Sequence, residues 1–202
     1  RNDVEKQPIT ETTDTLRGQI YGFADTLSAN TEHSVRILRQ RFPRKDVQFF
    51  PNDYSHNSGP TVGRGPTKRP RSILMLCRME PQKNIKFVIE AFSNSNLFVN
   101  GWTLDVVGGG PDELMIRALV SSLDLSSSVR IIGMLPGGSR LLQNYEFLIS
   151  ASDFEGSSNS IHEAVLSKTL PLVSTKIEEM NDVMSRRNLR ILSFQPDLES
   201  IV

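Results

Sequence analysis

From Ser72 onward, short apolar runs alternate with segments in which apolar residues recur at helical spacing. The apolar runs predict strands, and the periodic segments predict amphipathic helices. Uniformly apolar strands that alternate with helices are typical of a parallel sheet with helices on both faces. We therefore predict an α/β, Rossmann-like fold with strand 72–77, helix 84–93, strand 102–107, helix 112–122, strand 129–132, helix 139–144, strand 146–150, helix 159–168 and strand 170–174.

An earlier part of the chain, residues 21–53, predicts a smaller unit. Its pattern indicates, in order, a strand over 23–29, a helix capped by Asn30 and Thr31 and running to Phe42, and a strand over 47–50. Residues 54–71 hold mainly Ser, Asn, Gly, Pro and basic residues, a composition typical of a linker. We expect two folded regions, 1–53 and 72–202, on either side of this linker.

The two ends of the sequence look incomplete. It begins with Arg1 in a polar stretch without clear periodicity, and it stops shortly after Pro196 and Asp197, which resemble the start of a helix. We therefore expect an internal fragment of a longer protein, with its last domain truncated.

Composition narrows the class of protein. A hydrophobic content of 38% and a charged content of 23% are ordinary for a soluble globular protein. The 23 basic residues balance 23 acidic ones, which argues against a general nucleic-acid binder. Cys77 is the single cysteine, so no internal disulfide framework exists, and a reducing compartment fits. Because Cys77 sits in an apolar run, we expect a buried structural thiol. No apolar stretch is long enough to indicate a membrane span, and no secretory signal indicates export.

The most informative motif is a pair of carboxylates, Glu155 and Glu163, separated by a turn of small residues. An apolar strand precedes the turn and a helix follows it. Small side chains let backbone N–H groups approach a ligand, and a helix N-terminus suits phosphate. Eight helical residues would span roughly 12 Å, so the carboxylates could bracket a diphosphate and accept hydroxyl groups. This predicts a sugar-nucleotide site, although an isolated glutamate pair is more often two solvated charges at helix ends.

Other candidate residues follow the neighbouring strands. Arg78 and Lys83 come after the first strand of the series, the glycines 108–110 after the second, and Gly133 after the third. Ligands of parallel sheets bind outside the carboxyl ends of the strands. A lysine near a helix start is disfavoured by the helix dipole unless it has another purpose. The convergence of these residues therefore favours one ligand site over unrelated surface charges.

Taken together, residues from about 21 to 194 resemble the donor-binding half of family 4 glycosyltransferases, retaining enzymes with the GT-B fold. The resemblance rests on four motifs in order: a strand, arginine, lysine and helix over 73–92; a strand and glycine turn over 104–111; a strand over 129–133; and the Glu-x7-Glu signature from Glu155 to Glu163. Residues 23–53 resemble the last part of the N-terminal, acceptor-side domain of the family. The resemblance therefore implies one half of a GT-B fold after a hinge.

The sequence departs from the family pattern at several positions. Cys77 replaces the glycine before the arginine, and Asn84 replaces the glycine after the lysine, a tolerable change where a positive φ is needed. The turn after Glu155 reads Gly-Ser-Ser in place of Gly-Phe-Gly, although Asn159 is shared with a subset of the family. Ala151 and Leu170 replace a proline and a glycine. We expect these changes to alter donor preference rather than to abolish binding.

The resemblance implies a role for each matched residue. Arg78 and Lys83 would neutralise the donor diphosphate and stabilise the leaving group, and Glu155 would lie near the transferred sugar. Glu163 would accept hydrogen bonds from ribose hydroxyls. Backbone N–H groups of the turn would hold the phosphates, and the residues after Ile132 would line the base. The implied donor-binding set is Gly109, Gly110, Gly133, Met134, Gly156, Ser157, Ser158, Asn159, Ser160, Ile161 and Glu163.

The function implied is transfer of a hexose-type sugar, with retention, from a nucleoside-diphosphate sugar to a glycan or lipid-linked acceptor, as in polysaccharide synthesis. The family needs no cofactor or metal, and the sequence has no Asp-x-Asp pair and no histidine spacing typical of a metal site. We expect a cytoplasmic protein without nucleic-acid partners. Contact with the membrane surface would involve the missing N-terminal domain, without which we expect no turnover.

Two alternatives compete with this interpretation. Gly108, Gly109 and Gly110 after a strand suggest a dinucleotide-binding oxidoreductase, but Glu113 stands where its third glycine is needed, and the acidic residue expected further on is absent. The departures from the family pattern suggest a non-catalytic nucleotide-sugar-binding or scaffold module of the same fold.

Overall fold

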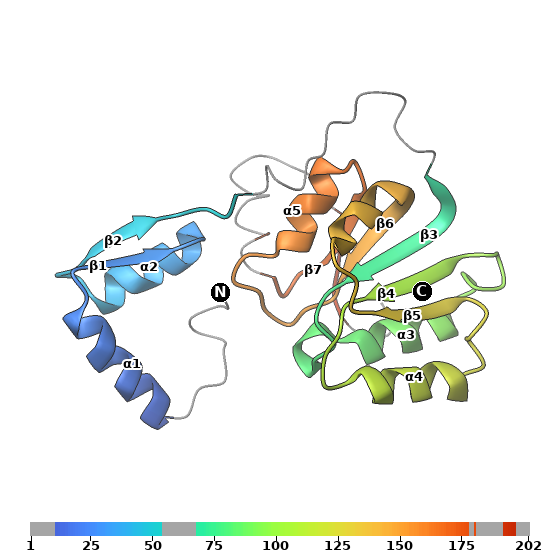
Figure 1. The fold of residues 1–202 in the computed structure, drawn as a ribbon, viewed down its shortest axis with the longest axis horizontal. Helices are drawn as coiled ribbons and strands as arrows, with labels where there is room; N and C mark the ends of the chain where they lie inside the picture. Colours follow the sequence, from blue (N-terminus) through green and yellow to red (C-terminus); the bar gives the residue numbers. More distant parts are fainter. Residues whose placement is uncertain (1–10, 54–67, 178–179, 181–191, 197–202) are drawn as a thin grey trace.

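The computed structural model describes residues 11–53, 68–177, 180 and 192–196 of this chain. They form a small α/β unit, residues 11–53, and a large unit that begins at the strand β3 (Figure 1). The two units lie side by side along the longest axis of the molecule. Most of the predicted linker lies outside the described residues, as does Asp197 of the predicted helix start near the end of the chain.

The large unit is built on a six-stranded sheet in the order β5-β4-β3-β6-β7-β8. Every neighbouring pair of strands is parallel. The chain moves outward in one direction from β3 and in the other direction from β6, so the strand order reverses between these two central strands. The strands are β3 (Arg69–Leu76), β4 (Thr103–Val107), β5 (Val129–Gly133), β6 (Tyr145–Ser150), β7 (Leu170–Ser174) and β8 (Leu192–Phe194).

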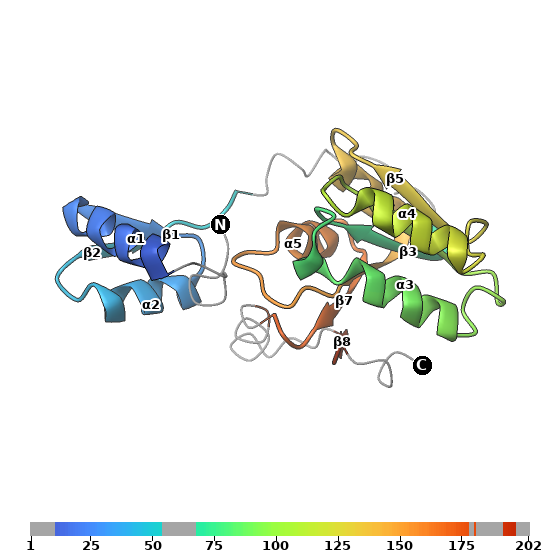
Figure 2. The ribbon, with the colours of Figure 1, turned by 90° about the horizontal axis from the view of Figure 1, so that it is seen from below.

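Helices cover both faces of this sheet, as the sequence predicts. On one face lie α3 (Ile85–Asn94) and α4 (Glu113–Ser122), seen together in Figure 2. On the other face lie the 3₁₀ helix η3 (Gly138–Asn144) and α5 (Asn159–Leu166). The prediction of an α/β, Rossmann-like parallel sheet is therefore confirmed.

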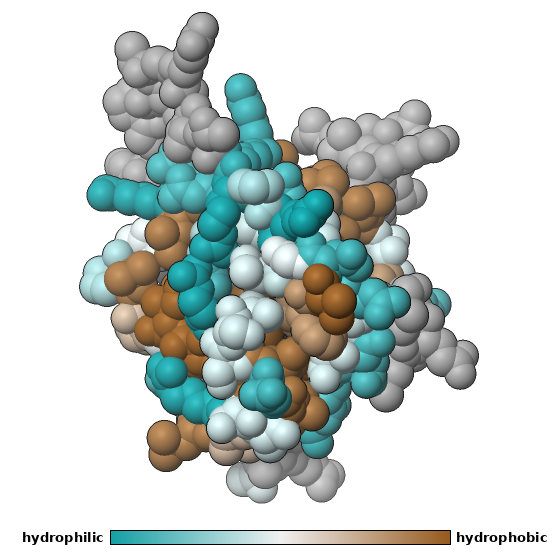
Figure 3. Space-filling model, turned by 90° about the vertical axis from the view of Figure 1, so that its right-hand side faces the viewer, coloured by the Kyte–Doolittle hydropathy of each residue, from teal (hydrophilic) through white to brown (hydrophobic). Residues whose placement is uncertain are grey.

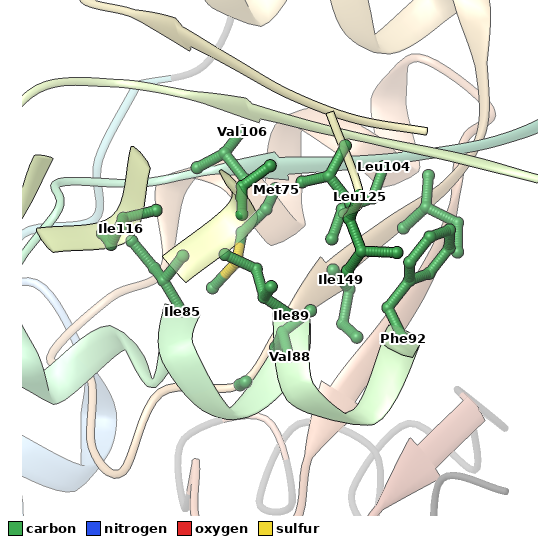
Figure 4. Packing of buried hydrophobic residues seen from close by; sticks show 14 of the residues in the cluster. Met75, Ile85, Val88, Ile89, Phe92, Leu104, Val106, Ile116, Leu125 and Ile149 are labelled. Carbon is green, nitrogen blue, oxygen red and sulfur yellow. The ribbon is translucent and has the colours of Figure 1, made fainter. Parts of the chain in front are cut away.

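Side-chain alternation along β3 explains the two cores. Met75 points to the core under α3 and α4, and its neighbour Leu74 points to the core under η3 and α5. Ile85, Ile89 and Phe92 recur on one side of α3 and pack against the strands (Figure 4). Successive strand residues face opposite sides of a sheet, whereas helix residues three or four apart share a face. These two spacings place an apolar layer on each side of the sheet.

The small unit pairs two parallel strands, β1 (Thr26–Ala29) and β2 (Asp46–Phe49). Between them runs α2 (Glu32–Arg41), whose N-cap is Thr31; the Ser34 amide donates to the Thr31 hydroxyl oxygen at 3.0 Å. This cap was predicted and is confirmed. The core of the unit consists of Leu27, Val35, Leu38 and Val47.

Several elements differ from the predicted ones. The helix α1 (Glu11–Phe23) and the short strand β8 were not predicted, and β1 begins three residues later than expected. The predicted helix over 139–144 is the 3₁₀ helix η3. Strand β3 begins at Arg69, so the last residues of the predicted linker belong to the sheet.

A buried carboxylate anchors this early start of β3. Asp105 of β4 is fully buried and accepts hydrogen bonds from Arg69 at 3.0 Å, from Arg130 at 2.8 Å and from the Tyr145 hydroxyl. Burial alone would raise the pKa of Asp105, but the hydrogen bonds from Arg130 and Tyr145 and the charge of Arg130 outweigh it, and the pKa lies below its ordinary value. The same burial and the Asp105 contact raise the pKa of Tyr145 to about 12. Four strands therefore meet at one ionised carboxylate.

The face of the large unit that is turned away from the small unit mixes hydrophilic and hydrophobic side chains (Figure 3). None of the helices in the described part of the chain has the length and the apolar content needed to cross a membrane.

Candidate functional site

A cleft of about 1320 Å³ opens at the carboxyl ends of the central strands. Its lining residues come from the ends of β3, β4 and β6, from the turn after β5 and from the start of α5. The cleft thus lies where the strand order reverses, the position at which open α/β sheets bind ligands. The turn before α5 lies on the side of the large unit that faces the small unit (Figure 1).

Most of the residues singled out from the sequence line this cleft. They are Arg78, Lys83, Gly109, Met134, Glu155, Ser157, Ser158, Asn159, Ser160 and Glu163. Residues separated by as much as 85 positions in the chain are therefore brought to one surface, from Arg78 to Glu163.

The other four, Gly110, Gly133, Gly156 and Ile161, are not among the lining residues. The Ile161 side chain is fully buried in the core under α5, and its amide donates to the Ser158 carbonyl at 3.2 Å. Gly156 is also buried. Gly133 ends β5 with a φ of +83°, a conformation that side-chain-bearing residues rarely adopt.

Gly110 has a packing role. A Cβ atom at this position would lie 2.2 Å from the Met79 carbonyl oxygen. The loops after β3 and β4 are joined there, because the Met79 amide donates to Gly109 and the Asp112 amide donates to Met79. The glycine thus permits a close approach of two loops that form one wall of the cleft.

Glu155 and Lys83 form an ion pair inside the cleft. Lys83 Nζ lies 2.7 Å from Glu155 Oε1, and each side chain is only 12% exposed. Ser152 Oγ donates to the same carboxylate oxygen at 2.7 Å. A partly buried charge needs a partner of opposite sign and hydrogen bonds to offset its lost hydration. Both conditions are met, so these two residues are not the solvated surface charges of the competing interpretation.

The backbone around Lys83 is fixed by contacts with the segment after β6. Lys83 ends the 3₁₀ helix η2 (Pro81–Lys83), and Asn84 follows it with a φ of 52°. The Asn84 side chain donates to the Ala151 carbonyl at 2.9 Å, and the Asp153 amide donates to the Gln82 carbonyl at 3.0 Å. The expectation that Asn84 replaces glycine at a positive φ is confirmed.

Arg78 lies at the mouth of the cleft with a largely exposed side chain. Its guanidinium is 3.7 Å from the Glu80 carboxylate, a distance too long for a strong hydrogen bond. The preceding residue, Cys77, packs against the core, and burial raises the pKa of its thiol to about 12. A neutral thiol fits the predicted structural role, but Cys77 is partly exposed and lines the cleft, so the prediction of a fully buried side chain is wrong.

The turn before α5 offers a helix N-terminus to the cleft. The N-cap residue is Ser158, whose side chain makes no capping hydrogen bond, and the helix begins at Asn159. Glu155 therefore precedes the helix, so the assumption of eight helical residues between the two carboxylates is wrong. His162 has a structural contact, because its Nδ1 lies 2.9 Å from the Ser158 carbonyl oxygen.

One contact reaches this turn from the small unit. Asn52 Nδ2 donates to Asn159 Oδ1 at 2.7 Å, and Asn30 Nδ2 donates to Asn52 Oδ1 at 3.2 Å. A chain of three amides thus connects the end of the small unit to the first residue of α5.

The charges of the cleft suit a ligand with both phosphate and hydroxyl groups. The lining cations are Arg78 and Lys83, and the lining carboxylates are Glu80, Glu155 and Glu163. Ionised carboxylates only accept hydrogen bonds, so they favour hydroxyl groups and repel further phosphates. No group of three or more metal-ligating side chains occurs in the described parts of the chain.

Sequence reasoning missed several lining residues. Ser152 follows the changed position Ala151 and was not singled out, yet it donates a hydrogen bond to the Glu155 carboxylate. Gln82 donates to the Phe154 carbonyl and thereby ties the two loops together. Gly137 and Gly138 also line the cleft. A glycine pair shortly after a strand was a usable signal, whereas the contacts of Ser152 and Gln82 depend on residues brought together by the fold.

Solved structures share this fold. A TarM mutant of S. aureus in complex with Fondaparinux, α-GlcNAc-glycerol and UDP superposes with a TM-score of 0.76 over 98% of this chain and 39% of its own, at 16% identity. The pneumococcal O-GlcNAc transferase GtfA with UDP and GlcNAc gives a TM-score of 0.68 over 81% of this chain and 33% of its own, also at 16% identity. The large unit therefore has the fold of one half of a GT-B glycosyltransferase.

Curated relatives are also glycosyltransferases. An uncharacterized glycosyltransferase of Methanocaldococcus jannaschii is 25% identical over 165 residues, which are 77% of this chain and 40% of the relative. The GtfA subunit of the UDP-N-acetylglucosamine–peptide N-acetylglucosaminyltransferase of Streptococcus gordonii is 27% identical over 154 residues, 75% of this chain and 30% of the subunit. The chain spans less than half the length of the curated relatives it matches. The family model described as glycosyl transferases group 1 matches residues 70–200, and the chain belongs to this family.

Proposed function

We propose that this chain carries the donor site of a retaining glycosyltransferase that moves a hexose-type sugar from UDP to a glycan or lipid-linked acceptor. The observation that carries the proposal is the cleft in which Lys83 pairs with Glu155 beside the N-terminus of α5, with Glu163 one helical turn further on. UDP is proposed as the nucleotide because it is bound by the structurally similar TarM and GtfA.

The phosphates belong at the start of α5 in this proposal. Backbone N–H groups of a helix N-terminus and the helix dipole attract anions. Lys83 has two ammonium protons beyond the one directed at Glu155, and Arg78 stands exposed at the cleft mouth. As the bond between sugar and phosphate breaks, negative charge grows on the leaving diphosphate. Cations already fixed in place stabilise that charge without reorganisation.

In this proposal the two carboxylates of the cleft, Glu155 and Glu163, accept hydrogen bonds from hydroxyl groups of the sugar nucleotide. Glu163 of α5 accepts hydrogen bonds from the ribose, and Glu155 accepts them from the transferred sugar. The base lies beyond the ribose, against Gly109 and Met134. In this proposal the diphosphate, the ribose, the transferred sugar and the base each lie against a different part of the cleft lining.

The proposal extends to the protein's setting. Because the chain spans less than half of its curated relatives, the acceptor site and turnover require sequence beyond it. No cofactor or metal takes part. Residues 11–53 belong to the acceptor-side domain, the hinge ends before β3 begins at Arg69, and membrane contact is peripheral and made by the rest of that domain. A reducing, cytoplasmic setting fits a sequence whose single cysteine, Cys77, has no partner for an internal disulfide.

The alternatives receive less support from the described residues. Glu113, which stands at the third-glycine position of a dinucleotide fingerprint, is engaged by Arg117 at 2.7 Å. Two of the departures from the family pattern that suggested a non-catalytic scaffold leave the local geometry of the cleft intact. Asn84 adopts the left-handed conformation that glycine would adopt, and Ala151 still supplies the carbonyl that Asn84 contacts.

Calorimetric titration of the chain with UDP, GDP and ADP tests the proposal. We expect saturable binding of UDP that weakens about tenfold or more in Arg78→Ala and in Glu163→Ala, since each removes a charged hydrogen-bond partner. Lys86→Ala and Glu90→Ala remove an exposed ion pair of α3 and serve as matched controls with unchanged affinity. Absence of detectable binding of all three nucleotides, or equal UDP affinity in the four variants, would contradict the proposed site.

A further inference from the structure

Two donors from different segments converge on one oxygen of Glu155. Lys83 Nζ, which follows β3, and Ser152 Oγ, which follows β6, each lie 2.7 Å from Oε1. Ser152 is 2% exposed, so little of its surface is open to water that would compete for this contact. Since an ionised carboxylate has no proton, both groups donate to it.

This arrangement distinguishes the two carboxylate oxygens. A carboxylate rotates about its terminal carbon–carbon bond with a low barrier, so a single contact would leave its orientation loose. Two donors that approach Oε1 from β3 and β6 fix the rotation. In the described parts of the chain, both side-chain donors to this carboxylate approach Oε1 and none approaches Oε2. Because Glu155 lines the cleft, Oε2 is the oxygen left for a ligand.

The two hydrogen-bonding groups, Lys83 Nζ and Ser152 Oγ, respond differently when a sugar nucleotide binds. Lys83 is a flexible side chain with an ammonium group that a diphosphate also attracts. The Ser152 hydroxyl is short and neutral, so a diphosphate attracts it less than it attracts the Lys83 ammonium group. When the Lys83 ammonium group also interacts with the diphosphate, the Ser152 hydroxyl still donates its hydrogen bond to Oε1.

We propose that Ser152 is a positioning residue that fixes Glu155 so that Oε2 accepts hydrogen bonds from hydroxyl groups of the transferred sugar. The assignment rests on the proposed donor site and deepens it. Although Ser152 lines the cleft, its hydroxyl donates to Glu155, so in this proposal it acts through Glu155 and not directly on the donor. Its removal therefore reduces the contribution of the sugar to binding and leaves the contribution of the nucleotide in place.

The comparison of UDP with UDP-sugars separates this role from a general structural one. Calorimetric titrations use UDP, UDP-glucose, UDP-galactose and UDP-N-acetylglucosamine against the unaltered chain, Ser152→Ala and Ser152→Thr. We expect Ser152→Ala to weaken the preferred UDP-sugar about tenfold, the size typical of one hydrogen bond to a charged group, and to change UDP affinity less than about twofold. Ser152→Thr keeps a hydroxyl and restores most of the affinity.

Ser95→Ala is the matched control, because Ser95 is another buried serine, at the end of α3, with its hydroxyl on the Phe92 carbonyl. It should leave all four affinities unchanged. Equal weakening of UDP and UDP-sugar by Ser152→Ala, no effect on either, or an unaltered chain that binds no UDP-sugar differently from UDP would overturn the assignment. Absence of UDP binding by the unaltered chain would refute the proposed donor site itself, and Ser152 would lose its role with it.

Discussion

Asn52, near the end of the small unit, donates a 2.7 Å hydrogen bond to Asn159, the first residue of α5. The two residues are 107 positions apart, and Asn159 lines the cleft. Asn30 in turn donates to Asn52, so the amide of Asn52 is oriented from the small unit. The turn that we assign to the donor phosphates is therefore in contact with the unit that we assign to the acceptor side.

This contact predicts coupling between Asn52 and Asn159 in ligand binding. Because the hydrogen bond is exposed, we expect Asn52→Ala to weaken UDP binding only about threefold, near the lower end for one hydrogen bond. In an Asn159→Ala background, Asn52→Ala should have no further effect. A double-mutant cycle measured by calorimetry provides the check, and equal losses in both backgrounds would show that the contact plays no part in binding.

Asn84 predicts a distinctive order of stability among its variants. Alanine in the left-handed conformation is strained and loses the contact with the Ala151 carbonyl, so Asn84→Ala should lower the free energy of unfolding by about 2 kcal/mol. Asn84→Gly loses only the hydrogen bond and should cost about 1 kcal/mol. Chemical denaturation of the three proteins measures the order, and an alanine variant as stable as the glycine variant would be inconsistent with the φ of Asn84.

Two adjacent glycines provide a matched test of the loop packing. A Cβ at Gly110 would lie 2.2 Å from a backbone oxygen, whereas one at Gly109 would meet side chains at ordinary contact distances, Met134 at 3.5 Å and Glu113 at 4.0 Å. Gly110→Ala should therefore destabilise the fold by about 1–3 kcal/mol through overpacking, and Gly109→Ala by much less. Urea denaturation compares the two, and similar losses in both variants would argue against the close approach at Met79.

Features that depend on neighbouring residues could be predicted from the sequence, whereas features that depend on contacts between distant residues could not. The strands β3 to β7 and the helices α3, α4 and α5 have regular apolar spacing, and the N-cap Thr31 and the αL residue Asn84 act locally, so these features were predictable. The three-residue strand β8 is too short for such a pattern, and apolar spacing did not distinguish the 3₁₀ helix η3 from an α-helix. Arg69 was assigned to a linker because its partner Asp105 lies 36 positions away. The helix α1 exposes Leu16 and Ile20, so little of its apolar surface is buried and its periodicity gave no clear signal. In the site, the carboxylates were evident from their spacing, but the role of Ser152 depended on a three-dimensional contact.

Because the buried Asp105 carboxylate is ionised in the folded state, we predict that the protein loses stability in acid. Its folded-state pKa lies below the ordinary value of 3.8. The stabilisation from the ionised form is therefore complete above that value and is lost as the pH falls through the lower folded-state pKa. Asp105→Asn should cost about 3 kcal/mol at neutral pH, because Arg69 and Arg130 lose their ionised partner.

The variant should also lose less stability than the unaltered chain when the pH is lowered below the ordinary value of 3.8. Urea denaturation at neutral pH and at about pH 3 compares the two proteins. An identical acid loss in both would mean that Asp105 is not the group responsible.

Hydrogen–deuterium exchange with and without UDP tests the central claim most directly, because it reports where the nucleotide binds. We predict that UDP slows amide exchange in the turn and helix start over 156–163 and in the loop over 77–83, and leaves the small unit over 26–49 unchanged. Protection confined to other segments, or none at saturating UDP, would contradict a nucleotide-sugar site at the start of α5.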